Sequence, residues 1–362
     1  MTKNTIKWGI IGCGKIANKF ATDLATIPDA ELYAVASRNQ ENANEFSEKY
    51  NAKKAYCSYS ELAKDENVDA VYIATPHSFH KAHAILCLQY KKAVLCEKPF
   101  AMNAAEVEEM IAVAKENNVL LMEALWTYFL PNYNYVLDIF RNKTFGELKE
   151  LKADFGFKPE YNLESRLLKK EVGGGSLLDI GIYPIFAALS TLGIPNSIDA
   201  KATFFETGAD SECNMVFYYQ NAKAYLKSTL LADTKTEAIF TFEDAVVKIN
   251  TMFHQPSTVT IYKEGLEETI DFGYTTIGYN FETEHFNQLL RENKKEPAIK
   301  ILIRKLVLQE LEAYQKKIQK GYVKKRNKYL TTGPQPAGAP YSKKPKQTRS
   351  KSAPPGFGGA EE

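Results

Sequence analysis

The chain has 362 residues and a mass of 40.8 kDa, which is enough for two domains at roughly 100–200 residues each. Hydrophobic residues make up 44% of it and charged residues 25%, the balance of a globular protein, and no run of about 18 apolar residues predicts a membrane span. Five cysteines without a CxxC pair favour free thiols and a reducing compartment, so we expect a cytoplasmic protein.

The net charge of +2 hides an uneven distribution. From Lys316 to the end the chain carries 12 Lys and Arg against 2 acidic residues, whereas the first 315 residues carry 34 basic and 42 acidic ones. The folded part is therefore acidic and gives no reason to expect nucleic-acid binding. An interaction with nucleic acid or an acidic protein is left to the basic tail alone.

Short apolar strands alternate with amphipathic helices over the first 125 residues. Strands are predicted at 6–11, 32–36, 68–74, 93–96 and 119–122, and helices at 16–24, 41–50, 79–90 and 104–117. Such alternation predicts right-handed βαβ units and a doubly wound parallel sheet. We therefore expect a Rossmann NAD(P)-binding domain over residues 1–125.

The pattern changes after about residue 145. A strand at 148–157 and an apolar helix at 176–192 precede about six strand-like segments with short links between 198 and 272. Short links predict a large open, mostly antiparallel sheet with the helix packed on it, and further helices are expected at 281–291 and about 301–318. We assign residues 126–321 to an α+β substrate and dimerisation domain.

Residues 322–362 contain 6 of the 15 prolines and almost no aliphatic side chains. Such a segment buries too little apolar surface to offset its ordering entropy. We expect a disordered basic tail rich in Pro and Gly.

A glycine turn follows the first strand directly and opens the first helix. The segment Gly12–Ala17 reads G-x-G-x-x-A, in which the first glycine permits the tight turn and the second lets the backbone approach a pyrophosphate. The alternative is a turn that only connects two elements. The strand–turn–helix context favours cofactor binding, and the residues expected to line the site are Gly12, Cys13, Gly14, Lys15 and Ile16.

The end of the second strand selects the cofactor. A site for NAD normally carries an acidic residue there to hold the ribose 2′-hydroxyl, but this chain has Ser37 and Arg38. A hydroxyl and a guanidinium suit a 2′-phosphate, so NADP is expected in preference to NAD. The alternative for Arg38 is a solvated loop residue.

Three further motifs carry a family resemblance. They are Thr75–His80, Val94–Pro99 and the glycine-rich segment Gly173–Pro184. Together with the glycine turn they resemble the Gfo/Idh/MocA oxidoreductases over roughly residues 5–320. The segments Glu123–Thr127 and Glu164–Leu167 look like the dimeric dihydrodiol dehydrogenase subgroup of that family.

The resemblance implies roles for individual residues. It implies catalytic roles for Lys98, Asp179 and Tyr183, with the tyrosine standing where many members have a histidine. It implies cofactor contacts from Thr75, Pro76, His80, Glu97 and Lys98. It implies substrate contacts from Trp126, Arg166, Asp179 and Tyr183.

The residues themselves agree with this reading in part. Lys98 follows a strand of the parallel sheet, at the edge where such sheets bind ligands. Asp179 and Tyr183 lie four residues apart on an apolar helix, so they share one face. The alternatives are a helix-internal hydrogen bond for Asp179 and core packing for Tyr183.

We therefore expect an NADP-dependent oxidoreductase acting on a diol, sugar or related hydroxyl or carbonyl compound, and a homodimer formed through the open sheet. The rival hypothesis is a pseudoenzyme that binds NADP as a sensor and regulates a partner. No metal is expected, because His77, His80 and His83 only partly share a helical face and no further ligand lies beside them in sequence.

Overall fold

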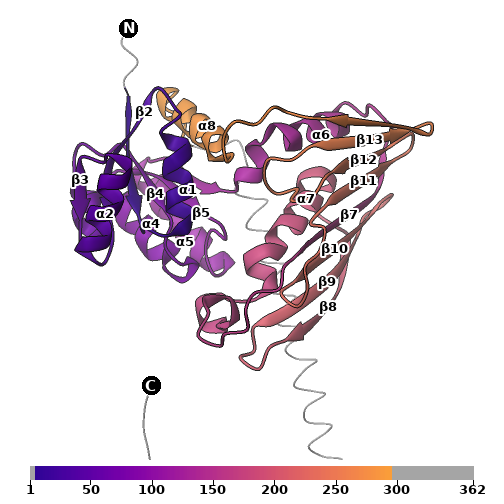
Figure 1. Ribbon diagram of the computed structural model, residues 1–362, viewed down its shortest axis with the longest axis horizontal. Coiled ribbons are helices and arrows are strands. Elements are labelled where there is room, and N and C mark those ends of the chain that lie inside the picture. Colours follow the sequence, from indigo (N-terminus) through magenta and orange to yellow (C-terminus); the bar gives the residue numbers. More distant parts are fainter. Residues whose placement is uncertain (1–4, 296–362) are drawn as a thin grey trace, which may run out of the picture. The chain divides into compact units, whose positions relative to one another are not determined.

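The structure, a computed structural model, describes residues 5–295. The helix expected at about 301–318 and the tail expected at 322–362 lie outside these residues. The described part contains two β-sheets with their associated helices (Figure 1).

The first sheet is parallel throughout, with the strand order β3-β2-β1-β4-β5-β6. Its strands are β1 (Ile6–Ile11), β2 (Ala30–Ala36), β3 (Lys54–Tyr56), β4 (Ala70–Ile73), β5 (Ala93–Glu97) and β6 (Leu121–Ala124). The helices between them are α1 (Lys15–Leu24), α2 (Gln40–Tyr50), α3 (Tyr59–Lys64), α4 (His80–Gln89) and α5 (Ala104–Asn117). This order is that of the dinucleotide-binding Rossmann fold, so the predicted fold class is confirmed.

The middle of this sheet is its most buried part. All of β4 is buried, and so is nearly all of β1, as expected for apolar strands that are covered on both faces. The sequence pattern missed β3 and α3. β3 has only three residues, none of them fully buried, so it leaves no apolar run to detect.

The second sheet has eight strands in the order β14-β13-β12-β11-β7-β10-β9-β8. They are β7 (Leu148–Gly156), β8 (Ser197–Phe204), β9 (Asp210–Tyr218), β10 (Lys223–Thr229), β11 (Ala238–Phe242), β12 (Val246–Ile249), β13 (Val259–Lys263) and β14 (Leu266–Ile270). Neighbouring strands run antiparallel, as predicted, except that β10 pairs with β7 in parallel. A parallel pair needs a crossover, and the chain between these two strands supplies one that includes a helix.

That helix is α7 (Ile182–Leu192), which packs on β7 and β10. The whole stretch Lys170–Leu192 is long and apolar enough to cross a membrane by length and composition alone, but almost all of its most apolar window is buried inside the protein. Its apolar character is thus accounted for by packing in the core. A further helix that the sequence pattern missed, α6 (Pro131–Arg141), contacts α7 and β12.

The last described helix, α8 (Tyr279–Arg291), packs against α1 of the first domain. The carboxylate of Asp23 on α1 accepts hydrogen bonds from the backbone N–H groups of Ile277, Gly278 and Tyr279, which are otherwise unpaired at a helix N-terminus. The indole of Trp8 on β1 donates to Asn287 (3.2 Å). The chain therefore returns from the large sheet to the nucleotide-binding domain.

Candidate active site

The glycine turn has the geometry that a dinucleotide requires. Gly12 has φ +94°, and a Cβ there would lie 3.0 Å from the carbonyl carbon and oxygen of Ala74. Gly14 ends the turn as the N-cap of α1 without a side-chain cap, and a Cβ added to it would meet no atom within 4 Å. No side chain caps the start of α1, and there is free space beside Gly14, so its first N–H groups are not paired by a capping side chain; such N–H groups can bind a phosphate. Ala17, fully buried, lets α1 approach the sheet closely.

The end of β2 presents the side chains that would select the cofactor. Arg38 is exposed, and no carboxylate within residues 5–295 forms an ion pair with it. The hydroxyl of Ser37 is half-buried and accepts a long hydrogen bond from the N–H of Asn39 (3.4 Å). A guanidinium without a protein anion beside it is suited to a phosphate.

The loop after β4 is braced by His80. The two ring nitrogens of this buried side chain lie 2.7 Å from the carbonyl oxygen of Thr75 and 2.9 Å from that of Pro99. Burial lowers the pKa of His80 to about 4, so the ring is neutral near pH 7 and donates to one carbonyl at a time. His80 thus joins the loop after β4 to the loop after β5.

The three residues expected to be catalytic come together. Lys98 follows β5, and its Nζ donates to the main-chain carbonyl of Asp179 (2.8 Å) and lies 5.1 Å from the centre of the Tyr183 ring. The Asp179 carboxylate accepts from Arg166 (3.0 Å). The Tyr183 hydroxyl accepts from the indole N–H of Trp126 (3.3 Å). The structure therefore brings together all the side chains for which substrate contact or catalysis was predicted.

The helix that carries Asp179 differs from the prediction. We expected one α-helix at 176–192, but Leu177–Gly181 forms a π-helical turn and α7 begins only at Ile182. A π turn offsets the backbone hydrogen bonds by one residue, and Pro184 has no N–H to contribute. Carbonyls near this junction therefore need other donors, and Lys98 is the donor for that of Asp179.

The charges in this cluster are fixed by their neighbours. Burial works against the charge of Lys98, but Tyr183, Asp179 and Glu97 outweigh it and raise the Lys98 pKa. Burial likewise opposes the Asp179 carboxylate, but Lys98 and Arg166 hold its pKa below the ordinary range. Near pH 7 the site thus holds an ammonium, a carboxylate and a guanidinium.

Tyr183 behaves differently. Burial raises its pKa above the ordinary value, and the opposing effect of Lys98 is too small to reverse the shift. The phenol is therefore protonated near neutral pH.

An aromatic wall surrounds Tyr183, and apart from Trp126 the sequence pattern missed its members. The ring of Trp126 stacks on Tyr279 (centroids 4.5 Å apart), and His254 lies against Phe155 (4.3 Å) and Tyr183 (4.8 Å). His254, Phe155 and Tyr279 come from a loop after β12, from β7 and from α8, whereas Trp126 follows β6. No local pattern joins segments so far apart, so only the fold reveals the wall.

Two histidines of the site have a buried ring nitrogen without a partner among the described residues. They are His77 at Nε2 and His254 at Nδ1, and burial lowers their pKa values to about 4 and about 3. Neither is part of a metal cluster, since residues 5–295 contain no group of three His, Cys, Asp or Glu side chains that could hold a metal ion.

Comparison with known proteins agrees with this architecture. Residues 6–125 match a family model described as "Oxidoreductase family, NAD-binding Rossmann fold". Residues 133–253 match the model of the "GFO/IDH/MocA C-terminal domain".

Three relatives indicate the range of chemistry. The trans-1,2-dihydrobenzene-1,2-diol dehydrogenase of Xenopus tropicalis is 38% identical over 306 residues, covering 81% of this chain and 92% of that protein. The scyllo-inositol 2-dehydrogenase (NADP(+)) IolU of Bacillus subtilis is 36% identical over 298 residues, covering 80% and 90%. A solved structure of KijD10, a 3-ketoreductase from Actinomadura kijaniata in complex with NADP and TDP-benzene, is 27% identical with a TM-score of 0.75, covering 84% and 95%.

Proposed function

This chain belongs to the Gfo/Idh/MocA oxidoreductase family, and from that premise we propose that it uses NADP to interconvert a hydroxyl and a carbonyl group in a diol, cyclitol or sugar. One observation carries the proposal: Lys98, Asp179 and Tyr183 converge beside the carboxyl edge of the nucleotide-binding sheet. That edge is where such sheets bind their ligands.

NADP is the cofactor that the site fits. The open glycine turn suits a pyrophosphate, and the exposed Arg38 with the neighbouring Ser37 suits a 2′-phosphate. The inositol dehydrogenase from Bacillus subtilis is named for NADP(+), and the ketoreductase structure contains NADP. When bound, this cofactor supplies or accepts the hydride.

Tyr183 is the acid in the reducing direction. Its phenol is protonated near pH 7 and can give a proton to the substrate oxygen as that oxygen gains charge. The ammonium of Lys98 stabilises the same developing charge, while the Asp179 carboxylate can accept a hydrogen bond from a neighbouring substrate hydroxyl. The other assignment makes Lys98 the acid and Tyr183 a group that positions the substrate.

The test is a turnover screen with the purified full chain. A panel of sugars, cyclitols, diols and dicarbonyl compounds is assayed in both directions with NADP(H) and with NAD(H). The proposal expects turnover on at least one polyhydroxylated compound and a preference for NADP(H). Tight NADPH binding without any turnover would instead favour the rival hypothesis of a pseudoenzyme that senses NADP.

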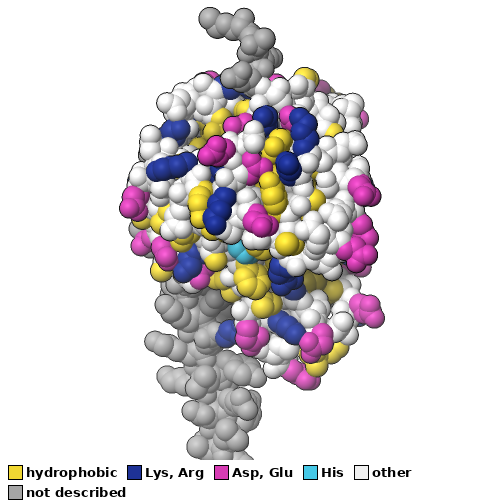
Figure 2. Space-filling view, turned by 90° about the vertical axis from the view of Figure 1, so that its left-hand side faces the viewer, with side chains coloured by type: hydrophobic (Ala, Val, Ile, Leu, Met, Phe, Trp, Pro, Cys, Tyr) yellow, Lys and Arg dark blue, Asp and Glu magenta, His cyan; other side chains and the backbone are white. Residues whose placement is uncertain are grey.

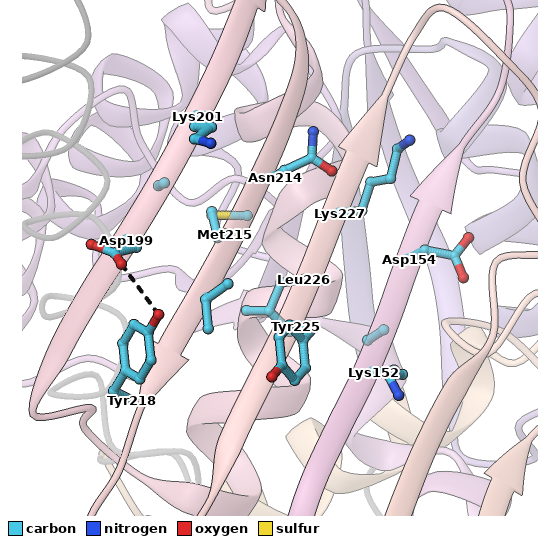
Figure 3. A pocket seen from close by; sticks show the side chains of 13 residues that line it. Lys152, Asp154, Asp199, Lys201, Asn214, Met215, Tyr218, Tyr225, Leu226 and Lys227 are labelled. Carbon is cyan, nitrogen blue, oxygen red and sulfur yellow. Dashed lines mark hydrogen bonds between the residues drawn. The ribbon is translucent and has the colours of Figure 1, made fainter.

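We further propose a homodimer formed through the outer face of the large sheet. Figure 3 shows that lysine, aspartate, asparagine and tyrosine side chains from β7, β8, β9 and β10 line a hollow on this face. Opposite charges and aromatic rings are mixed there, as with Asp199 and Tyr218, which share a hydrogen bond (3.2 Å). Such a surface can complement itself about a two-fold axis.

The described face of the nucleotide-binding domain carries mixed charges. Figure 2 looks onto the nucleotide-binding domain, and on the described residues of that face Lys and Arg alternate with Asp and Glu. This mixture is unlike the continuous basic stripe of a nucleic-acid-binding surface.

All five cysteines are free thiols, which supports the cytoplasm as the protein's location.

A further inference from the structure

A buried carboxylate immediately precedes the proposed catalytic lysine in the chain. Glu97 is the last residue of β5 and is 7% exposed. One of its oxygens accepts a hydrogen bond from the hydroxyl of Tyr72, and the other accepts from the backbone N–H of Lys98 (3.1 Å). Both oxygens thus have donors inside the protein.

Tyr72, one of the two donors to Glu97, is held in place by its packing. Tyr72 lies on β4, is fully buried, and stacks flat on Phe20 of α1, with ring centroids 3.7 Å apart. The packing of the Tyr72 ring restricts its hydroxyl, which donates to Glu97. The carboxylate is therefore fixed between the helix that starts at the glycine turn and the residue that follows β5.

The titratable groups that face Glu97 come from every element around it. They are Tyr72 on β4, Cys96 and Lys98 on and after β5, Glu123 on β6, Tyr183 on α7 and Tyr279 on α8. Of these six, Lys98 is the cation. Burial raises the pKa of Glu97 to about 7, against the opposing effects of the Tyr72 hydrogen bond and Lys98.

Glu97 in turn acts on both catalytic groups. Its negative charge favours the protonated form of Lys98 and of Tyr183, and so contributes to the raised pKa of each. Burial makes this charge effective, because the protein interior screens it less than bulk water would. If Glu97 loses its charge, both groups release their protons more readily.

We propose that Glu97 is a positioning residue whose negative charge keeps Lys98 and Tyr183 protonated. Tyr72, through its hydrogen bond, in turn favours the charged form of Glu97. This inference rests on the proposed function, because it takes Tyr183 as the acid. It also assigns the hydrogen bond from Tyr72 to Glu97 a role in catalysis rather than in packing alone.

The experiment compares Glu97→Gln with Tyr72→Phe over pH 5.5–10.5, measuring alcohol oxidation with NADP⁺. In the wild type, the rate should rise with pH as Tyr183 loses its proton. Near pH 7 the ionisation of Glu97 raises the Tyr183 pKa, so the rise should flatten there before it resumes. Glu97→Gln keeps the side chain's shape but removes its charge. The flattening should disappear, and the alkaline rise should move to lower pH by about one to three units, the usual effect of a nearby charge.

Tyr72→Phe distinguishes an effect of the Glu97 charge from a general structural disturbance of the site. It removes the hydrogen bond that favours ionised Glu97, so the flattening should move above pH 7. The alkaline rise should stay at its wild-type position, because Glu97 is ionised at that pH in this variant too. A merely structural disturbance would lower the rate at every pH and would move neither feature.

A second measurement needs no turnover. The pKa of Tyr183 is followed by NMR of protein labelled with [¹³Cζ]tyrosine, with Tyr183→Phe identifying the resonance. Glu97→Gln should lower this pKa by the same about one to three units. A shift without any catalytic activity would support the inference while the proposed function fails.

The inference is overturned if the Tyr183 resonance titrates alike in the wild type and in Glu97→Gln. It is also overturned if the two variants change the pH profile in the same way. If Glu97→Gln does not fold, the Tyr72→Phe profile decides, since an unmoved flattening near pH 7 contradicts the inference.

Discussion

At the scale of single residues, the proton that accompanies hydride transfer depends on Tyr183. Replacing it with Phe keeps the ring between His254 and Lys98 but removes the hydroxyl that Trp126 contacts. Turnover should fall by about 10²–10⁴, the usual contribution of a positioned acid, while NADPH affinity stays unchanged. Steady-state kinetics and a binding titration check this, and near-normal turnover would make Lys98 the acid.

Cofactor choice depends on Arg38. Arg38→Ala should weaken NADPH binding by about 1.5–3 kcal/mol, the range for a hydrogen bond to a charged group. NADH binding should barely change, because NADH carries no 2′-phosphate. Fluorescence titration with both cofactors measures the difference, and an equal loss for both would remove Arg38 from the phosphate site.

The buried Glu97 also makes stability depend on pH. Its pKa is about 7 in the folded chain, against an ordinary value of 4.5, so between these values the folded state holds the proton that the unfolded state has lost. Stability therefore falls as pH rises from about 4.5 to 7. Glu97→Gln lacks this penalty and should be more stable than the wild type at pH 8, by about 2–3 kcal/mol.

Denaturant unfolding at pH 5 and pH 8 checks this prediction. The advantage of Glu97→Gln should be largest at pH 8 and much smaller at pH 5, which lies only just above the ordinary pKa that Glu97 has in the unfolded chain. A variant that is less stable than the wild type at both values would show that the carboxylate is needed for packing.

At the scale of elements, the turn between β1 and α1 contains two glycines with different tasks. Gly12→Ala forces a side chain onto φ +94° and against the carbonyl of Ala74, so it should cost about 1–3 kcal/mol of stability. Gly14→Ala meets no neighbour within 4 Å and has φ −91°. It should leave the fold intact.

Both variants should bind NADPH at least tenfold more weakly, because each disturbs the approach of the pyrophosphate to the backbone. Thermal unfolding separates them, since only Gly12→Ala should melt earlier. Unchanged NADPH affinity in Gly14→Ala would show that the turn only connects two elements.

The helical segment that carries Asp179 and Tyr183 shows how much of the site could be predicted from the sequence. The spacing of Asp179 and Tyr183 predicted that they lie close together, because a shared helix face follows from spacing alone. It did not predict the π turn, whose residues are as apolar as those of the helix that follows. The role of the Asp179 carbonyl therefore could not be predicted, since it depends on backbone pairing and not on side-chain type.

At the scale of the whole molecule, the proposed dimer can be tested on the sheet face itself. Val216 and Tyr225 lie opposite each other on β9 and β10, and replacing both with Asp puts four additional charges into a two-fold interface. The wild type should have twice the mass of the 40.8 kDa chain by light scattering, and this variant should be monomeric. Leu266→Asp, on the exposed edge strand β14, is the control that should remain dimeric.

The alternation of strands and helices predicted the first sheet, and the short links between successive strands predicted the second, because period and segment length are local properties. The parallel pairing of β7 with β10 and the return of α8 to the first domain are contacts between distant segments. They depend on which surfaces are complementary in three dimensions. The aromatic wall of the site is assembled by these same contacts, which is why it too escaped prediction.

The packing of α8 on the nucleotide-binding domain has a consequence for biosynthesis. When the first 125 residues leave the ribosome, their sheet can form, but Trp8 still lacks the ring of Phe286 and the amide of Asn287 that cover it. At about 5–20 residues per second, α8 emerges roughly ten to thirty seconds later. Throughout that interval the nascent nucleotide-binding domain exposes an apolar face, so chaperone binding during translation should be strongest before α8 emerges.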